Sequence, residues 1–270
     1  YACAVTPPSK SVLRRLRGAC ARTIWGQSNR WRANEIVFTL FTKGHVVDPL
    51  QAFAHNTMVT ARRVLTKRPH LLAMFTRVLQ KRLEGPNDLG GPVAALLKAA
   101  DVANFTFEDS CTVFHLKEED PLEVQGIDWL TADTGRFLHT LRHSLRQEQW
   151  DELHYRRLSF QGTRTGIDRP ATLGLLKQLG GLHRYMLKCI LSGALSTQDR
   201  LHRAYPEEHS PLCPCCKLEV EDTSHVFESC PQHEPLRYTE IDPALWETLP
   251  KCLKLQGLMP ADFEAPGDGT

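Results

Sequence analysis

The chain lacks the patterns that mark membrane and secreted proteins. It contains no run of about 18 apolar residues, the length that a helix needs to cross a bilayer. Its first residues do not follow the charged, apolar and small-residue order of a secretion signal. We therefore expect a soluble, intracellular protein with no membrane partner. Because the chain begins with Tyr1 and not with Met, we also expect it to be a piece of a longer protein.

Several catalytic signatures are absent as well. The sequence has no H-E-x-x-H step of a zinc protease and no glycine-rich phosphate loop. A zinc nucleobase deaminase needs H-x-E and P-C-x-x-C, but H-x-E is absent and Pro211 lies one residue too far from Cys213. A template-directed polymerase needs closely spaced carboxylates for two metal ions, and the only dense acidic cluster, Glu118 to Asp120, lies in a proline turn that we interpret as solvated. We therefore predict no catalytic residues in this chain.

The composition is typical of a folded, globular chain. With 270 residues, 41% of them apolar, it can bury the core of one large domain or two small ones. The nine cysteines are an odd number and are scattered, which argues against the disulfide framework of a secreted protein. We expect five of them to be ordinary buried side chains: Cys3, Cys20, Cys111, Cys189 and Cys252.

The other cysteines crowd into one short stretch. Cys213, Cys216, His225 and Cys230 form a C-x2-C-x8-H-x4-C array. Three thiolates and one imidazole suit a tetrahedral zinc ion, and two cysteines separated by two residues can reach one ion from a tight turn. Because four protein ligands leave no open position for water or substrate, we predict a structural Zn²⁺ site and not a catalytic one.

The ligand set of this array has alternatives. Cys215 could replace Cys216, although Cys213 and Cys215 alone form an unusually tight pair. His209 and His233 flank the array and are spare ligands. The spacing favours Cys216, since two residues then separate it from Cys213.

Charge alternates along the chain, although the net charge is only +2. Two segments are mainly basic: 12 basic and 2 acidic residues lie in 10–68, and 12 basic and 5 acidic residues lie in 136–203. Two segments are mainly acidic: 11 acidic and 5 basic residues lie in 69–135, and 13 acidic and 4 basic residues lie in 204–270. Arginines interleaved with aromatic side chains suit a nucleic-acid backbone with stacked bases. We therefore predict RNA or DNA as a partner, bound through arginines of the two basic blocks: Arg14, Arg15, Arg142, Arg146, Arg156 and Arg157.

These arginines have a second interpretation. They can be the solvated sides of amphipathic helices, in which case Trp25 and Trp31 belong to the core. The second block supports this view with leucines at helical spacing, which we expect to be buried: Leu138, Leu141, Leu145 and Leu153.

Acidic side chains surround the zinc array, namely Glu219, Glu221, Asp222 and Glu228. Negative charge disfavours contact with phosphate. We therefore expect the arginine blocks to contact the nucleic acid and the zinc site to stabilise the fold.

Helical patterns dominate the sequence and predict a mainly α fold, with helical-bundle halves followed by a small zinc-containing knuckle. Asp48, Pro49 and Gln51 form a helix start with a capping carboxylate and a proline in the first turn. Other helices are expected over about 10–24, over 32–43 with Gly44 as the stop, over 69–85, from 92, over 131–158 and over 173–191 with a glycine break at 180–181. Residues 105–130 predict a short strand or an irregular connector.

The C-terminal third has its own start and stop signals. Ser196 to Asp199 predicts a capping box for a helix directly before the knuckle. Thr223 or Asp222 can cap a short helix with His225 in its first turn and Cys230 just beyond its end. The tail after Pro250 is rich in proline and glycine, and we expect it to fray.

These patterns divide the chain into five consecutive segments. They are a basic helical region at 1–104, an acidic connector at 105–130, a second basic helical region at 131–204, the zinc knuckle at 205–237 and a tail at 238–270.

The stretch from 193 to 231 resembles a known family. It contains Gly193-Ala-Leu-Ser-Thr-Gln-Asp-Arg-Leu-His202, then Cys213-Pro-Cys-Cys216, Glu221-Asp-Thr-Ser-His225 and Cys230-Pro231. This order resembles the region that follows the polymerase core in reverse transcriptases of non-LTR (LINE-type) retrotransposons. The similarity covers about residues 170–237. Residues 35–49 are less specifically similar to the thumb and connection of such a polymerase, so the resemblance places 1–104 there.

The resemblance implies a function. The four array residues would be the family's zinc ligands, and the helical regions would help to hold template RNA or target DNA during reverse transcription. The partners would be RNA or DNA and the remainder of the parent polymerase polypeptide, and the location would be nuclear.

The sequence departs from this family at the catalytic centres. The aspartate pair of the polymerase is missing, so the chain would begin after the active site. Asp242, Glu247 and Lys251 do not have the spacing of the nuclease that follows the knuckle in some relatives. We therefore expect neither activity from these residues alone.

Two other hypotheses remain open. The chain can be a helical protein-interaction module in which zinc only stabilises a docking surface. It can also belong to an enzyme whose catalytic half lies outside this sequence.

Overall fold

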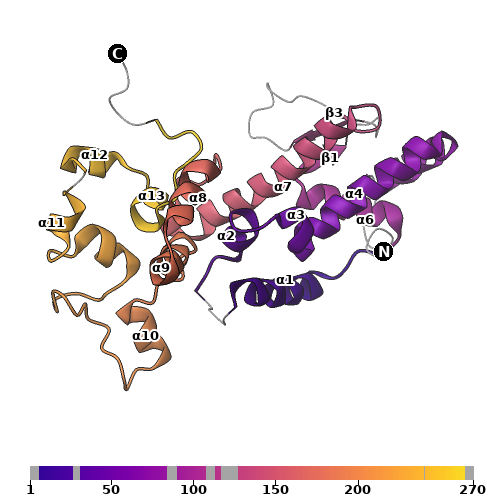
Figure 1. Cartoon of the computed structure of the whole chain (residues 1–270). Helices are drawn as coiled ribbons and strands as arrows, with labels where there is room; N and C mark the ends of the chain where they lie inside the picture. Colours follow the sequence, from indigo (N-terminus) through magenta and orange to yellow (C-terminus); the bar gives the residue numbers. More distant parts are fainter. Residues whose placement is uncertain are drawn as a thin grey trace, which may run out of the picture. The chain divides into compact units, whose positions relative to one another are not determined.

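The computed structural model describes residues 6–26, 31–83, 90–107, 113–116, 127–239 and 241–264. These residues fold mainly into helices (Figure 1), which confirms the predicted mainly α class. No helix within these ranges is long and apolar enough to cross a membrane. Cys3, Cys111 and the acidic turn from Glu118 to Asp120 lie outside the described residues.

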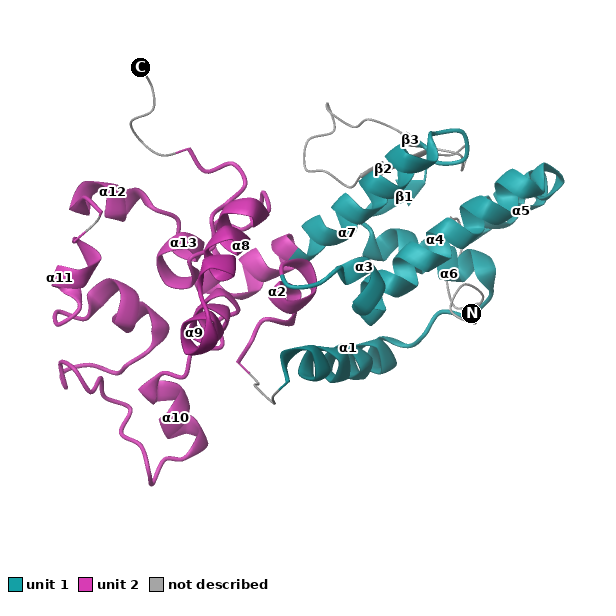
Figure 2. Ribbon diagram, in the orientation of Figure 1, with its two compact units in different colours: residues 1–26, 41–149 teal, residues 27–40, 150–270 magenta. Residues whose placement is uncertain are grey.

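Two compact units make up the chain (Figure 2). Unit 1 contains residues 1–26 and 41–149, and unit 2 contains residues 27–40 and 150–270. Each unit is therefore assembled from two separate pieces of the sequence, whereas the sequence patterns suggested consecutive segments.

The helices of unit 1 pack around an apolar core. The unit contains α1 (Lys10–Trp25), α3 (Gly44–Val47), α4 (Pro49–Lys67), η2 (Pro69–Leu71), α5 (Leu72–Leu83), α6 (Pro92–Val102), β1 (Phe105–Phe107), β2 (Val113–Leu116), β3 (Ile127–Asp128) and residues 134–149 of α7 (Thr134–Arg156). Helix α4 lies against α1, α3 and α6. The buried core includes Leu13, Phe53, Ala54, Met58, Leu65, Leu96, Ala99, Phe105, Trp129, Phe137, Leu141 and Leu145.

Helix α4 begins where the sequence predicts. Asp48 is its N-cap, and one carboxylate oxygen accepts a hydrogen bond of 3.0 Å from the backbone N–H of Leu50. The other oxygen pairs with the guanidinium of Arg17 at 2.9 Å, and the Asp48 side chain is fully buried. The apolar stripe that was predicted for this helix faces the core: Phe53, Ala54, Met58 and Leu65 are buried, and Leu50 and Ala61 are partly buried.

The prediction that Gly44 ends a helix was wrong. The helix before it, α2 (Asn34–Thr39), is shorter than expected, and Gly44 is the first residue of α3. Gly44 is buried, and a Cβ atom there would lie 2.5 Å from Oε1 of Gln51. A Cβ atom here would therefore crowd the side chain of Gln51 in the first turn of α4, and Gly44 begins a helix instead of stopping one.

A small antiparallel sheet occupies part of the segment that was predicted as a strand or connector. Its strand order is β1-β2-β3, with Phe105 opposite Leu116 and Val113 opposite Asp128. Trp129 follows β3 and is fully buried. The Nε of Arg62 on α4 donates a hydrogen bond of 2.6 Å to the carbonyl of Trp129, which fixes the end of the sheet to the helices.

Unit 2 combines α2 with the C-terminal half of the chain. It also contains residues 150–156 of α7, η3 (Leu158–Phe160), α8 (Arg169–Gln178), α9 (Gly181–Leu191), α10 (Gln198–Ala204), the π turn η4 (His225–Ser229), α11 (Glu234–Arg237), α12 (Pro243–Thr248) and α13 (Lys251–Gln256). Buried apolar residues include Ile36, Val37, Phe38, Trp150, Leu153, Phe160, Leu176 and Leu191.

Polar contacts hold the α2 segment in unit 2. The backbone N–H of Ala33 donates to the carbonyl of Ser192 at 2.7 Å. The carboxylate of Glu35 pairs with the guanidinium of Arg156 at 3.0 Å. A short helix far away in the sequence is thus tied to the C-terminal half by both backbone and charged groups.

The tail after Pro250 does not fray over the part that the structure describes, so that prediction was wrong. Residues 251–256 form α13, and its Cys252 and Leu255 are buried. Burial raises the pKa of Cys252 to about 12. Cys252 and Cys189 are therefore ordinary buried thiols, as predicted, whereas Cys20 is half-buried. Residues 265–270 lie outside the described ranges.

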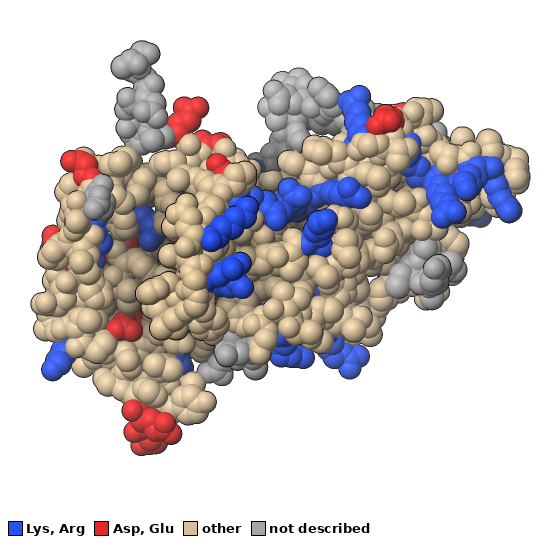
Figure 3. Space-filling view, viewed as in Figure 1, with Lys and Arg blue, Asp and Glu red and all other residues tan. Residues whose placement is uncertain are grey.

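Charge follows the two units. Unit 1 has 18 Lys and Arg against 13 Asp and Glu, and unit 2 has 15 against 18. On the face drawn in Figure 3, basic side chains gather over the part of unit 1 that contains α4, α5 and α7. The basic surplus and the cysteine array therefore belong to different units.

Candidate metal centre

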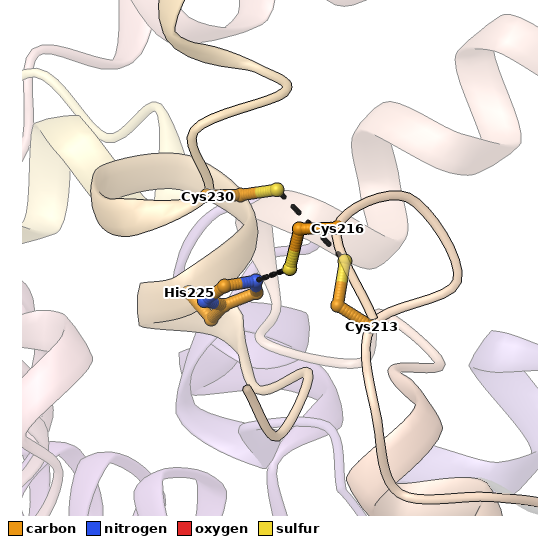
Figure 4. Close-up of side chains that lie close together, drawn as sticks. All are labelled: Cys213, Cys216, His225 and Cys230. Carbon is orange, nitrogen blue, oxygen red and sulfur yellow. Dashed lines mark hydrogen bonds between the residues drawn. The ribbon is translucent and has the colours of Figure 1, made fainter. Parts of the chain in front are cut away.

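A tight loop presents the first two cysteines of the array. Leu212 and Val220 pair as an isolated antiparallel bridge, and the backbone N–H of Cys213 donates to the carbonyl of Glu219 at 2.8 Å. Between them the chain turns, with Lys217 in the left-handed region at φ 59°. The N–H of Lys217 donates to the carbonyl of Cys213 at 2.8 Å. This loop directs Cys213 and Cys216 toward the same point (Figure 4).

A wide helical turn presents the second pair. Asp222 caps it, because its carboxylate accepts a hydrogen bond of 2.7 Å from the N–H of His225. Residues 225–229 form the π turn η4, closed by a hydrogen bond of 2.7 Å from the N–H of Cys230 to the carbonyl of His225. π turns are rare in proteins and occur frequently at functional sites. Here it brings Cys230 beside His225, as Figure 4 shows.

The four side chains meet as the array predicts. The sulfurs of Cys213 and Cys230 lie 3.9 Å apart, and the sulfur of Cys216 lies 3.3 Å from Nε2 of His225. All four ligand atoms lie within 4.8 Å of one another, so this group could hold a metal ion. Cys213, His225 and Cys230 are buried, and Cys216 is partly exposed.

The alternative ligands lie outside this group. Cys215 is exposed to solvent. The ring centroid of His209 lies 6.3 Å from that of Tyr205, Nδ1 of His233 donates to the carbonyl of Val226 at 3.2 Å, and neither histidine belongs to the group. The geometry therefore gathers Cys216 and not its neighbour.

Glu219 orients the imidazole of the site. Its carboxylate lies 3.1 Å from Nδ1 of His225, and the hydroxyl of Ser229 lies 3.2 Å from the same nitrogen. A proton on Nδ1 leaves the lone pair of Nε2 to face the sulfurs, as in histidines that bind metals. In the sequence Glu219 is only one of several acidic residues around the array, because its contact with His225 depends on how the loop folds.

The loop also activates one thiol. Hydrogen bonds from the backbone N–H groups of Leu218 and Glu219, together with its contact to His225, lower the pKa of Cys216 to about 6. Burial instead raises the pKa of Cys213. A thiolate is the form that binds metals, so Cys216 is ready to bind at neutral pH.

Glu221 joins the knuckle to the preceding helix. One oxygen of its carboxylate accepts from the N–H of Gln198 at 3.0 Å, and its carbonyl accepts from the N–H of Asp199 at 3.1 Å. The N-cap of α10 is Thr197, and its side chain makes no capping hydrogen bond. The capping box predicted from Ser196 was therefore wrong, because a glutamate of the knuckle supplies the acceptors.

The six arginines predicted to bind nucleic acid lie in different environments. Arg14 and Arg15 on α1 are exposed. Arg142 and Arg146 on α7 are half-buried in unit 1, and Nε of Arg142 donates to Nε2 of His55 at 3.4 Å.

The remaining two arginines make contacts within unit 2. Arg156 pairs with Glu35 and with Glu152, both at 3.0 Å. Arg157 donates to the carbonyl of Trp31 at 2.7 Å, and burial lowers its pKa. These contacts link α7 to the segment around α2.

Comparison with known proteins does not assign a function to this group of residues. No protein family, curated protein or solved structure matches the chain.

Proposed function

We propose that this chain is a zinc-stabilised nucleic-acid-binding region of the kind that follows the polymerase core in non-LTR retrotransposon reverse transcriptases. It would support the binding of template RNA or target DNA and would carry out no chemical step itself. The observation that carries this proposal is the group of three sulfurs and one imidazole nitrogen within 4.8 Å. The motifs from Gly193 to Pro231 supply the link to the family.

The choice of zinc rests on the donor set. Cys213, Cys216 and Cys230 are soft thiolate donors, which zinc prefers over oxygen ligands. Tetrahedral zinc with bonds of about 2.3 Å to sulfur has sulfur–sulfur edges of about 3.8 Å. The separation of 3.9 Å between Cys213 and Cys230 fits that edge. With His225 as the fourth ligand, the ion would stabilise the fold and leave no open coordination position.

The proposed nucleic-acid surface lies on unit 1. This unit has a surplus of basic residues, and Arg14 and Arg15 are exposed on one helix. The acidic knuckle is a poor phosphate partner, since Glu219 and Glu221 lie beside the metal ligands. Arg156 and Arg157 are engaged with carboxylates and carbonyls of unit 2, so we assign them a supporting role.

Zinc binding can be tested with two neighbouring cysteines. Cys216→Ser should lose the ion and lower the unfolding temperature, whereas Cys215→Ser should keep about one zinc per chain. Metal content and thermal unfolding measure both effects. A Cys216→Ser protein with a full equivalent of zinc and an unchanged unfolding temperature would contradict the proposed ligand set.

Nucleic-acid binding can be tested through its salt dependence. Each lost phosphate contact lowers the slope of log affinity against log salt by about one. The double variant Arg14→Gln/Arg15→Gln should therefore bind a single-stranded RNA or DNA more weakly and with a shallower slope. Lys251→Gln removes one exposed charge from unit 2 and serves as the control. No binding by the unmodified chain at low salt would refute the proposal.

A protein-interaction module is the second candidate. Its supporting observation is an apolar edge on the knuckle, where Leu212, Leu218 and Val220 are 42%, 75% and 48% exposed. Replacing Leu218 with Ser should then abolish binding of a protein partner and leave nucleic-acid binding unchanged. Equal binding of a protein partner by Leu218→Ser and by the unmodified chain would contradict this second candidate.

A further inference from the structure

Unit 1 contains a group of basic side chains from three helices, which we call the His–Arg cluster: His45 on α3, His55 on α4, and Arg142 and Arg146 on α7. The imidazole rings of His45 and His55 lie 5.0 Å apart. Nε of Arg142 lies 3.4 Å from Nε2 of His55. Three segments that are distant in the sequence therefore converge on one place.

Arg142 and Arg146 are cations, and the two histidines carry a positive charge only when they are protonated. Burial lowers the pKa of His45, and the charges that lower it further belong to His55, Arg142, Arg146 and Lys43. Asp48, the acidic residue at the end of α3, has its carboxylate paired with Arg17. Positive groups gathered in this way repel one another and create a local field that attracts an anion.

Accessibility separates a ligand site from a purely structural cluster. His55 is 9% exposed and accepts a hydrogen bond from Arg142, so it forms the buried side of the cluster and holds Arg142 in place. His45, Arg142 and Arg146 are only half-buried, and Lys43 is exposed beside them. Part of each of these side chains is therefore accessible to solvent.

We propose that the His–Arg cluster binds one phosphate group through Arg142, Arg146 and the protonated ring of His45. Guanidinium groups suit phosphate because their N–H donors match its oxygens in geometry and charge. The identity of the ligand rests on the proposed function, under which the group is a backbone phosphate of RNA or DNA. The cluster would then be a defined contact in unit 1, separate from the exposed arginines of α1.

Binding would take up a proton at His45. In the free protein, burial and the neighbouring positive charges hold the pKa of His45 below its ordinary value. A bound phosphate opposes those charges and raises this pKa in the complex. Affinity is therefore highest at low pH and falls as the pH rises through the pKa of the complex.

The first experiment uses the whole chain and inorganic phosphate, with the His45 ring followed by NMR as the pH is varied. Phosphate should raise the pKa of His45. Arg142→Gln and Arg146→Gln should each weaken binding on the order of tenfold, as expected for a hydrogen bond to a charged group. Arg63→Gln is the control, because it removes an exposed base about two turns further along α4.

Two results would overturn the phosphate site. One is a His45 resonance that phosphate does not shift at any pH. The other is equal phosphate affinity in Arg142→Gln and Arg63→Gln. Should Arg142→Gln alter the circular dichroism spectrum, His45→Gln replaces it, since His45 is only half-buried. With the oligonucleotide described below, whose charge does not change over this pH range, that variant should lose the pH dependence of binding, and a retained pH dependence would contradict the role of His45.

A second arm uses an oligonucleotide without terminal phosphates. Its phosphodiesters keep one charge across this pH range, so a pH effect on affinity reports on the protein. Displacement of inorganic phosphate and the same shift of His45 would support a backbone phosphate as the ligand. Binding that leaves His45 unchanged would reject the cluster as the contact and leave the proposed function standing. Phosphate binding without oligonucleotide binding would support the anion site and reject the proposed function.

Discussion

Glu219 lies next to the candidate metal site without being one of the four residues that form it. Its carboxylate faces Nδ1 of His225, and its side chain is 66% exposed. A carboxylate in this place fixes the tautomer of the ligating ring and strengthens the nitrogen as a donor. It also remains accessible to solvent, so its contribution is smaller than that of a fully buried partner.

Removing this carboxylate should weaken the metal site without destroying it. We expect Glu219→Ala to lower zinc affinity about tenfold, since residues that orient a ligating histidine affect affinity by roughly 10- to 100-fold. Competition with a chromophoric chelator measures the change. Glu207→Ala, which removes an exposed carboxylate from the same unit, is the matched control. Equal affinities for the two variants would show that Glu219 does not act on the imidazole.

The lowered pKa of Cys216 predicts a pH profile for the metal-free chain. Below pH 6 the thiol is protonated and unreactive, and above it the thiolate dominates, so alkylation of Cys216 should rise with a midpoint at about 6. Cys215 should react only at higher pH, because slight desolvation of its thiol and the neighbouring Cys213 raise its pKa. Mass spectrometry after a short pulse of iodoacetamide distinguishes the two. An ordinary midpoint at Cys216 would show that the N–H groups of Leu218 and Glu219 do not hold the sulfur without metal.

At the scale of elements, the start of α4 combines a cap with an ion pair. Asp48 both accepts from the first turn of α4 and neutralises Arg17 of α1. Both groups are shielded from water, with side-chain exposures of 0% for Asp48 and 14% for Arg17. Removing one partner of a buried pair leaves an uncompensated charge, which is more costly than the pair itself is stabilising.

Asp48→Ala should therefore lower the free energy of unfolding by about 3 kcal/mol. Asp242→Ala removes the N-cap of the short helix α12, whose capping hydrogen bonds are exposed, and should lower it by about 1 kcal/mol. Urea denaturation of the two variants gives the comparison. Similar losses would mean that the pair with Arg17 adds nothing beyond the cap.

Sequence patterns correctly predicted the elements that are stabilised by residues close to one another in the sequence. The cap and proline at Asp48 and Pro49, and the spacing of Cys213 and Cys216, gave the correct start of α4 and the correct loop. The helix stop predicted at Gly44 was wrong because this glycine packs against the side chain of Gln51. The capping box predicted for α10 was wrong because Glu221, a distant residue, accepts the hydrogen bonds of its first N–H groups. Contacts between distant residues leave no spacing in the sequence, and this is also why the convergence of His45 with α7 could not be predicted.

At the scale of the whole molecule, the metal site should stabilise one unit selectively. Glu221 connects the knuckle to α10, and the π turn η4 contacts α13, so an ion bound at this site would support elements on both sides of it. The buried core of unit 1 contains no residue of the knuckle, of α10 or of α13.

Removing the metal should therefore loosen unit 2 first. After chelation, we expect backbone amides of α10, η4 and α13 to exchange faster with deuterium, while those of α4 and α6 keep their protection. Hydrogen exchange followed by mass spectrometry resolves these segments, and Cys215→Ser with bound zinc is the control. Equal loss of protection in α4 and α10 would show that the two units unfold together.

Because unit 2 is built from two separate pieces of the sequence, it cannot fold completely until the second piece has been synthesised. Residues 31–40 leave the ribosome well before residue 150, yet their buried Ile36, Val37 and Phe38 belong with the later half. Until that half is made, these apolar side chains have no permanent partners, and non-local pairings of this kind slow folding and favour aggregation. A fragment that starts at residue 150 would lack them altogether, so recombinant production of unit 2 requires that residues 31–40 be supplied, for example as a separate peptide.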